Sequence, residues 1–306
     1  MKNILLLFLL AFTVQQAFAQ DEAIFTHYHI TPMLVSPAYA GFTETQQIHL
    51  NARVQWTGFT DSPKTYNAAF NTNVGSTFGI GLAILSESAA QLNRFRAQLN
   101  YALRFRVKDD FRFAVGVSTE FQRLSVDNDV SGTNFFQAGD DLLNEVLDGR
   151  AIFDASLGFY GTYRENTFGG LTFSNLVRSR LDDIVAEGNR QSFFQYYLFL
   201  FGHKFDLIDA NFTLEPSFMV RQIRNSPFQV DFNLKAGFLD EQLIAGLSYR
   251  SIGALGVLLG TKLSMFKLYY SYDVSFQRFQ KFNMGSHELT LVFAFKKKER
   301  PVDKGY

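Results

Sequence analysis

In the stretch of residues 91–107, QLNRFRAQLNYALRFRV, nearly every second side chain is apolar. The apolar set is Leu92, Phe95, Ala97, Leu99, Tyr101, Leu103, Phe105 and Val107, and the set between them includes Arg94, Arg96, Arg104 and Arg106. Because successive side chains of a strand point to opposite faces, this pattern predicts a strand with one apolar and one cationic face. The strand is long enough to cross a bilayer at a tilt, so the pattern favours lipid on its apolar side.

The same alternation recurs along the chain and predicts about 14 strands. They are expected at residues 47–56, 66–73, 78–84, 91–107, 111–122, 152–163, 168–176, 193–205, 211–223, 228–239, 242–250, 254–263, 266–276 and 286–296. Short turns follow the even-numbered strands, at residues 75–76, 108–110, 164–166, 206–210 and 240–241, and the long connections follow the odd-numbered ones. This asymmetry is typical of outer-membrane barrels, whose short turns face the periplasm.

We therefore predict an all-β fold, a single transmembrane antiparallel β-barrel over residues 46–296, with short periplasmic turns and longer extracellular loops. The alternative is one soluble β-sandwich, or two in tandem. Sandwich strands also alternate, but they are typically shorter and lack the asymmetry between the two rims.

The beginning of the chain has the pattern of an export signal. A basic start is followed by an apolar run over residues 4–14 and by the small-residue site Ala17-Phe18-Ala19, which predicts a signal peptide at residues 1–19 with cleavage between Ala19 and Gln20. We expect residues 20–45 to form an N-terminal periplasmic or plug-like segment and residues 297–306 a periplasmic tail.

Composition narrows the possible chemistry. The chain has no cysteine, which excludes a lipoprotein anchor, disulfides and thiolate metal sites. Its 29 basic and 29 acidic residues balance, so net charge gives no reason to expect a nucleic-acid partner. With 35 phenylalanines and only six prolines, the composition fits many uninterrupted strands with much aromatic surface.

On the barrel interpretation, a set of charged side chains points into the lumen: Arg94, Arg96, Arg104, Arg106, Arg112 and Glu120. Two interpretations remain open. Oppositely charged lumen groups can pair and stabilise a largely filled barrel, or the arginine-rich strand can bind an anion or line a selective pore. We favour the paired lining.

No residue pattern indicates catalysis. His27 and His29 offer at most two metal ligands, and no histidine belongs to a recognisable nucleophile motif. Residues 125–150 are acidic but lack the spacing of a calcium loop, so we expect a solvated surface loop. Gly79 and Gly81 are expected to relieve crowding or to let the sheet bend. We expect a protein without enzymatic activity, cofactor or metal.

Several short sequence motifs are, in combination, more specific than the alternation of apolar and polar residues. They are Pro37, Ala38, Tyr39, Ala40 and Gly41 in SPAYAG; Arg53, Trp56 and Gly58 in RVQWTG; Tyr249-Arg250; Tyr272-Asp273; and Gly285, Ser286, His287 and Glu288 in GSHE. With these motifs the chain resembles the PorP/SprF family, outer-membrane proteins associated with type IX secretion and gliding in the Bacteroidetes. The chain departs from the family at Ser36, where asparagine is commoner, and in its long acidic segment 125–150.

The resemblance implies an outer-membrane barrel that supports secretion of an adhesin-like cargo and anchors it at the cell surface through the cargo's C-terminal sorting domain. It also implies contact with outer-membrane lipid and with the periplasmic ring lipoprotein of the secretion and gliding machinery. The alternative is an outer-membrane transport channel for small hydrophobic or anionic solutes.

Overall fold

The computed structural model describes residues 25–107, 110–126, 149–177, 179–180, 196–207, 211–223, 228–276 and 284–296. Its strands are β1 (Thr45–Val54), β2 (Lys64–Val74), β3 (Phe78–Ala89), β4 (Leu92–Val107), β5 (Phe111–Val126), β6 (Arg150–Tyr163), β7 (Thr167–Phe173), β8 (Ser179–Arg180), β9 (Tyr196–His203), β10 (Phe205–Leu207), β11 (Phe212–Ile223), β12 (Gln229–Phe238), β13 (Leu243–Arg250), β14 (Ala254–Leu263), β15 (Phe266–Ser275) and β16 (Ser286–Lys296). The predicted signal peptide with its Ala19–Gln20 cleavage site, the tail 297–306 and residues 127–148 of the acidic loop lie outside the described residues.

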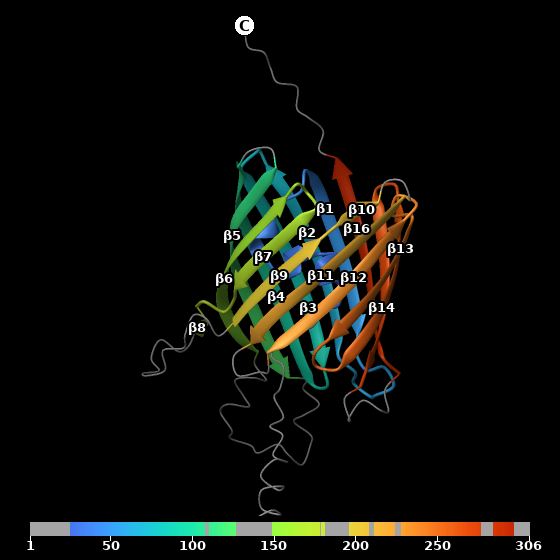
Figure 1. The fold of residues 1–306 in the computed structure, drawn as a ribbon. Helices are drawn as coiled ribbons and strands as arrows, with labels where there is room; N and C mark the ends of the chain where they lie inside the picture. Colours follow the sequence, from blue (N-terminus) through green and yellow to red (C-terminus); the bar gives the residue numbers. More distant parts are fainter. Residues whose placement is uncertain are drawn as a thin grey trace, which may run out of the picture.

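The strands form one closed antiparallel barrel (Figure 1). β1 pairs with β16 over ten residue pairs, from Thr45 opposite Lys296 to Val54 opposite His287, so the first and last strands close the sheet. β9 and β10 pair with the same strand, β11, on either side of Lys204 and act as one interrupted strand. β8 is a two-residue addition to β6. The barrel therefore has 14 strands, which confirms the predicted fold class.

Some predicted boundaries were wrong by a few residues. Asp206 and Leu207 belong to β10, where they pair with Thr213 and Phe212, and not to a turn at residues 206–210. The acidic connection is shorter than predicted, because β5 continues to Val126 and pairs with β4 along its whole length. In each case a neighbouring strand supplies the pairing that extends the strand.

The distribution of side chains is the reverse of that in a soluble protein. On β4, Leu99 is 42% exposed on the outer face, while the adjacent Asn100 is fully buried inside. Large apolar side chains cover the outer face of the other strands as well, and asparagine, serine, threonine and charged groups line the interior. This apolar outer face is suited to lipid. No helix among the described residues is long and apolar enough to cross a membrane.

Residues 25–42 lie inside the barrel, and we call them the plug segment (Figure 1, blue). It contains three 3-10 helices, η1 (His27–His29), η2 (Pro32–Leu34) and η3 (Pro37–Tyr39). Proline stands at the first position of η2 and of η3, where its fixed φ suits a helix start and its missing N–H leaves no bond unmade. The segment runs lengthwise, from Thr26 beside the long-loop end of β16 to Phe42, whose ring lies under Arg112 at the short-turn end of β5.

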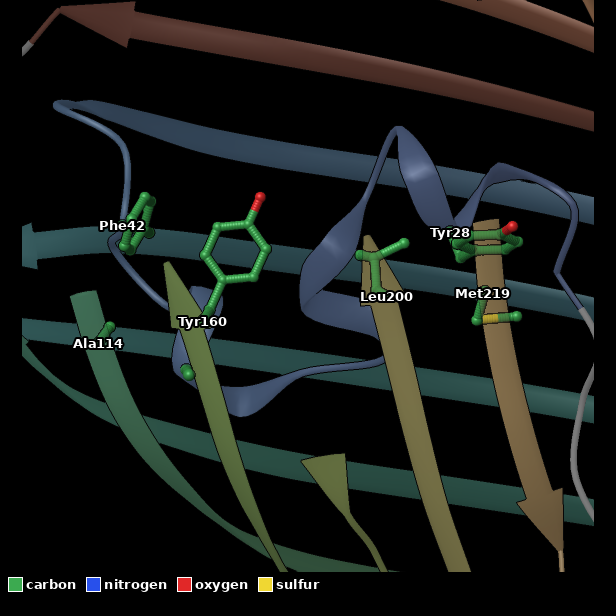
Figure 2. Close-up of a cluster of buried hydrophobic side chains, with 7 residues drawn as sticks. Tyr28, Phe42, Ala114, Tyr160, Leu200 and Met219 are labelled. Atoms are coloured by element: carbon green, nitrogen blue, oxygen red, sulfur yellow. The ribbon is translucent and has the colours of Figure 1, made fainter. Parts of the chain in front are cut away.

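The plug segment supplies the centre of the apolar core (Figure 2). Tyr28 and Phe42 pack with Ala114, Tyr160 and Met219 of the barrel wall. The Phe42 and Tyr160 rings meet edge to face, with centroids 4.8 Å apart. Without this segment the described wall would enclose no apolar core of comparable size, so the lumen is filled by the chain's own N-terminal part.

Candidate functional site

Five charged side chains from separate strands meet inside the barrel near its long-loop end, and we call them the charge cluster. They are Arg53 on β1, Asp231 on β12, Arg250 on β13, Asp273 on β15 and Glu288 on β16. Arg53 Nη1 lies 2.7 Å from Glu288 Oε2, and its Nη2 lies 2.9 Å from Asp273 Oδ2. Arg250 Nε lies 3.3 Å from Asp231 Oδ2. All five are at most 8% exposed, and buried charges of this kind are tolerated because each is paired.

Glu288 joins the charge cluster to the plug segment. Its carboxylate accepts hydrogen bonds from the backbone N–H groups of Thr26 and His27, at 2.8 and 3.2 Å. It also accepts one from Asn51 Nδ2 at 2.8 Å, besides the bond from Arg53. These backbone N–H groups near the start of η1 therefore donate to a negatively charged acceptor, and such charge-assisted hydrogen bonds are stronger than neutral ones.

The Thr26 hydroxyl lies at the centre of the charge cluster. It donates to Asp273 Oδ2 at 2.7 Å and accepts from Arg53 Nη1 at 2.9 Å and Arg250 Nη2 at 3.3 Å. One small side chain of the plug segment therefore contacts three of the five charged groups. A hydroxyl suits this position because it can donate and accept at once.

Further polar contacts hold the same end of the plug segment. His27 Nδ1 lies 2.7 Å from Thr290 Oγ1, and Thr31 Oγ1 lies 3.0 Å from His49 Nδ1. Asn233 donates to the Tyr28 hydroxyl. Burial lowers the pKa of His27, although Glu288 opposes the shift, and burial lowers the pKa of His29 still further. Both rings are consequently neutral at pH 7.

The opposite half of the barrel holds the plug segment by close packing. Met33 and Ala40 lie against Ala69, Ala83 and Ala102 of β2, β3 and β4. A Cβ at Gly79 would lie 1.9 Å from the Ala40 carbonyl oxygen, and one at Gly116 would lie 2.4 Å from the Ala38 nitrogen. Glycine is required at both positions because the two backbones touch. Gly79 was predicted to relieve crowding, and the group that lies against it is the backbone of the plug segment.

Beside the plug segment lies a cavity of about 160 Å³, which we call the vestibule. Phe25, Tyr28, Leu34 and Val35 of the plug segment line it on one side. The barrel residues that line it come from the long-loop halves of strands β2 to β7, β9 and β11 and include Arg94, Arg96, Gln98, Glu120, Asp154 and Arg221. The vestibule therefore belongs to the long-loop half of the lumen.

The arginines of β4 have individual partners. Arg94 Nη1 lies 3.5 Å from Glu87 Oε2, and Arg96 Nε lies 3.4 Å from Glu120 Oε1. Arg104 donates to the carbonyl oxygens of Gly75 and Ser76 in the β2–β3 turn, at 3.1 Å each.

Two further arginines lie at the short-turn rim. Arg112 lies 3.3 Å from Glu165 and stacks over the Phe42 ring at 5.4 Å. Arg106 is exposed at that rim. The six predicted lumen charges thus do not converge on one anion site.

A second group of motif residues joins two loops at the long-loop rim. The Trp56 N–H donates to Ser286 Oγ at 3.1 Å, and the Thr57 N–H donates to the Gly285 carbonyl at 2.8 Å. Gly58 and Gly285 have φ of 100° and 85°, which favours glycine. His287 lies against Tyr272, with ring centroids 5.1 Å apart.

The remaining predicted positions are separate from these groups. Pro37, Ala38, Tyr39, Ala40 and Gly41 form η3 and the turn after it, and Tyr249 is on the outer face. No group of three or more metal-ligating side chains occurs within the part of the chain that the structure describes. The arrangement is that of a filled barrel with a polar attachment point for the plug segment.

The model of the type IX secretion system membrane protein family PorP/SprF matches residues 17–293. The chain belongs to the PorP/SprF family. Outer-membrane localisation follows from this membership and from the barrel fold, as predicted. No curated protein sequence matches the chain.

Solved structures similar to this PorP/SprF member are outer-membrane barrels. The toluene transporter TbuX of Ralstonia pickettii has a TM-score of 0.54 at 12% identity, covering 87% of this chain and 93% of that one. The CymD monoaromatic hydrocarbon channel has a TM-score of 0.54 at 9% identity, covering 92% and 96%. At such identities the likeness establishes the fold alone.

Sequence reasoning identified Arg53, Arg250, Asp273 and Glu288 by family motif but missed Thr26 and Asp231. Asp231 alternates with apolar neighbours in the sequence QVDFNLK, a signal that could have assigned it to the lumen. Thr26 carries no such signal, because it lies outside the strands and its partners are 27 to 262 residues away in the sequence.

Proposed function

We propose that this PorP/SprF protein supports secretion of an adhesin-like cargo by the type IX system and anchors that cargo at the cell surface through its C-terminal sorting domain, without enzymatic activity. The observation that carries the proposal is the filled lumen of a type IX secretion family member. A barrel occupied by its own N-terminal segment suits an accessory that holds a cargo better than it suits the conduit for that cargo.

The two rims suggest how the partners divide. We assign the cargo to the long-loop rim, where the paired β1–β2 and β15–β16 loops display Trp56, Phe59 and Met284. We assign the periplasmic ring lipoprotein of the secretion and gliding machinery to the short-turn rim, because short turns of such barrels face the periplasm.

The deciding experiment is deletion of the gene, followed by measurement of the adhesin encoded beside it in the outer-membrane and culture-fluid fractions. We expect the adhesin to be lost from the cell surface and to return on complementation with the wild-type gene. An adhesin that remains secreted and attached in the deletion strain would rule the proposal out. Mild-detergent purification of the tagged barrel, followed by mass spectrometry, tests both partner assignments.

The transport channel is the second candidate function. The solved structures similar in fold include hydrocarbon channels, but the lumen here is lined by asparagine, serine, threonine and charged side chains. Such a wall suits hydrophilic or anionic solutes better than hydrophobic ones. Uptake of labelled solutes by cells with and without the gene distinguishes this candidate from cargo anchoring.

A further inference from the structure

We propose that the plug segment is a displaceable gate, and that the barrel conducts small hydrophilic ions when residues 25–42 leave the lumen. This activity is separate from cargo anchoring and can be measured on the purified barrel alone. It rests on four features of the contact between the plug segment and the wall.

The first feature is the hydrogen bonding of the plug backbone. Among the described residues, each bond between a plug backbone group and another backbone group stays within the plug segment, such as Ile30 to His27, Ser36 to Pro32 and Phe42 to Tyr39. The wall is closed independently, by the pairing of β1 with β16. The segment can therefore move without breaking any rung of the sheet.

The second feature is where the plug segment is attached. Its side-chain hydrogen bonds to the described wall all come from β1, β12, β13, β15 and β16. The other side holds it by packing, through the alanines and glycines of β2 to β5 and through Arg112 and Tyr160 against the Phe42 ring, with no hydrogen bond among the described residues. Hydrogen bonds on one side and packing contacts alone on the other suit a part that detaches as a unit.

The third feature is the polarity of the wall behind the plug segment. Asn100 is fully buried, and neither its Oδ1 nor its Nδ2 has a hydrogen-bond partner among the described residues. The buried hydroxyls of Ser118 and Thr172 likewise have no hydrogen-bond partner among the described residues. A permanent core favours apolar groups here, since buried polar groups without partners are costly, whereas a lumen that water enters favours polar ones.

The fourth feature is size. Barrels of about eight strands are filled by their own side chains, and those of 16 to 18 strands leave an aqueous channel. A 14-stranded wall lies close to the second class. The vestibule of about 160 Å³ already opens part of the long-loop half, and the plug segment forms one side of it.

The test uses Thr26→Val, which keeps the shape of the side chain but removes the hydroxyl that contacts Arg53, Arg250 and Asp273. Thr261→Val is the matched control, because the Thr261 hydroxyl on β14 donates to the exposed Gln242 carbonyl and makes no hydrogen bond to the described plug segment. In planar bilayers with potassium chloride we expect Thr26→Val to raise the open fraction at least tenfold, and Thr261→Val to leave it unchanged.

A reversible lock completes the test. A Cβ at Gly158 would lie 2.9 Å from Ser36 Oγ, within reach of a disulfide, and the natural chain has no cysteine to compete. The same Cβ would lie 2.8 Å from Pro37 Cδ, so the oxidised protein is compared with the reduced form of the same variant. Adding Ser36→Cys and Gly158→Cys to Thr26→Val should abolish the current on oxidation and restore it on reduction. Equal currents from the two threonine variants, or a current that persists after complete oxidation, would overturn the proposal.

A labelling experiment covers the case of a variant that folds poorly. Asn100→Cys places a single thiol behind the plug segment, and heat-modifiable migration reports whether the barrel is folded. A hydrophilic maleimide should label this thiol at least several-fold faster when Thr26→Val is added, and at an unchanged rate with Thr261→Val. Equally slow labelling of all three folded proteins would mean that the plug segment is a permanent core.

Discussion

Arg53 on β1 and Glu288 on β16 face each other across the seam where the first strand of the barrel pairs with the last, and their side chains form an ion pair of 2.7 Å. The same carboxylate accepts the backbone N–H groups of Thr26 and His27. One pair of charges therefore lies both at the seam that closes the barrel and at the attachment point of the plug segment.

Replacing Arg53 should be among the most damaging single changes in the chain. Arg53→Ala leaves Asp273 and Glu288 buried without their shared cation, a situation that typically costs about 3–5 kcal/mol. We expect a large fall in the free energy of unfolding, measured by urea titration in lipid vesicles. Arg164→Ala, which removes an exposed partner of Asp110, should be nearly neutral, and equal effects of the two changes would contradict the role of the charge cluster.

Gly79→Ala should displace the plug segment without breaking the barrel. The added methyl group would lie 1.9 Å from the Ala40 carbonyl oxygen. Neither group can rotate away, because the methyl carbon is bonded directly to Cα and the oxygen is a backbone atom. We expect faster hydrogen exchange of residues 30–42, measured by mass spectrometry. At Gly169 the nearest atom to a new Cβ is 3.4 Å away, so Gly169→Ala should leave the exchange of this segment unchanged.

The outer and inner faces of β4 should respond oppositely to charge. Leu99 lies on the apolar face and Gln98 lines the vestibule. An arginine on the lipid face near the bilayer midplane costs about 2–4 kcal/mol, so Leu99→Arg should be strongly destabilising. Gln98→Arg should change the free energy of unfolding by less than about 1 kcal/mol, since the lumen accommodates charge. The same measurement in vesicles compares them directly.

The contribution of each β4 arginine to the free energy of unfolding should increase with the burial of its side chain. Arg96 and Glu120 are 15% and 9% exposed and lie 3.4 Å apart, whereas Arg106 is exposed at the rim. We expect Arg96→Gln to lower the free energy of unfolding by about 1–2 kcal/mol and Arg106→Gln to have a smaller effect. Normal folding of Arg96→Gln with altered ion selectivity would instead favour the selective-pore interpretation of this strand.

Acid should release the plug segment. Burial lowers the pKa of His27 and His29 in the seated state, and a displaced segment would return both to about 6.5. As the pH falls, these histidines bind protons at a higher pH in the displaced state than in the seated state. The free energy that favours the seated state is therefore greatest above pH 6.5 and decreases below pH 6.5.

The current of Thr26→Val should therefore be larger at pH 5.5 than at pH 7.5. Replacing both His27 and His29 by glutamine should flatten this dependence, while His203→Gln, outside the plug segment, should preserve it. A current that does not change with pH would refute the explanation.

Much of the barrel could be predicted from the sequence, because strand side chains alternate with a period of two wherever one face meets lipid and the other does not. Leu99 and Asn100 differ in environment for that local reason, and the positions of the longest connections separated the two rims, although the β3–β4 and β13–β14 connections at the long-loop rim are short. The local pattern was insufficient where pairing with a neighbouring strand determines the secondary structure. Asp206 is a strand residue of β10 because it pairs with Thr213 of β11.

The chain's own order of residues thus determined the barrel, its strand number and the side of the wall on which each strand residue lies. The tertiary structure alone decided that residues 25–42 fill the lumen and that Thr26 joins Arg53, Arg250 and Asp273. The physical reason is distance along the chain. A short segment without periodicity gives no local signal of its partners, and closure of the barrel brings together groups that lie up to 262 residues from Thr26 in the sequence.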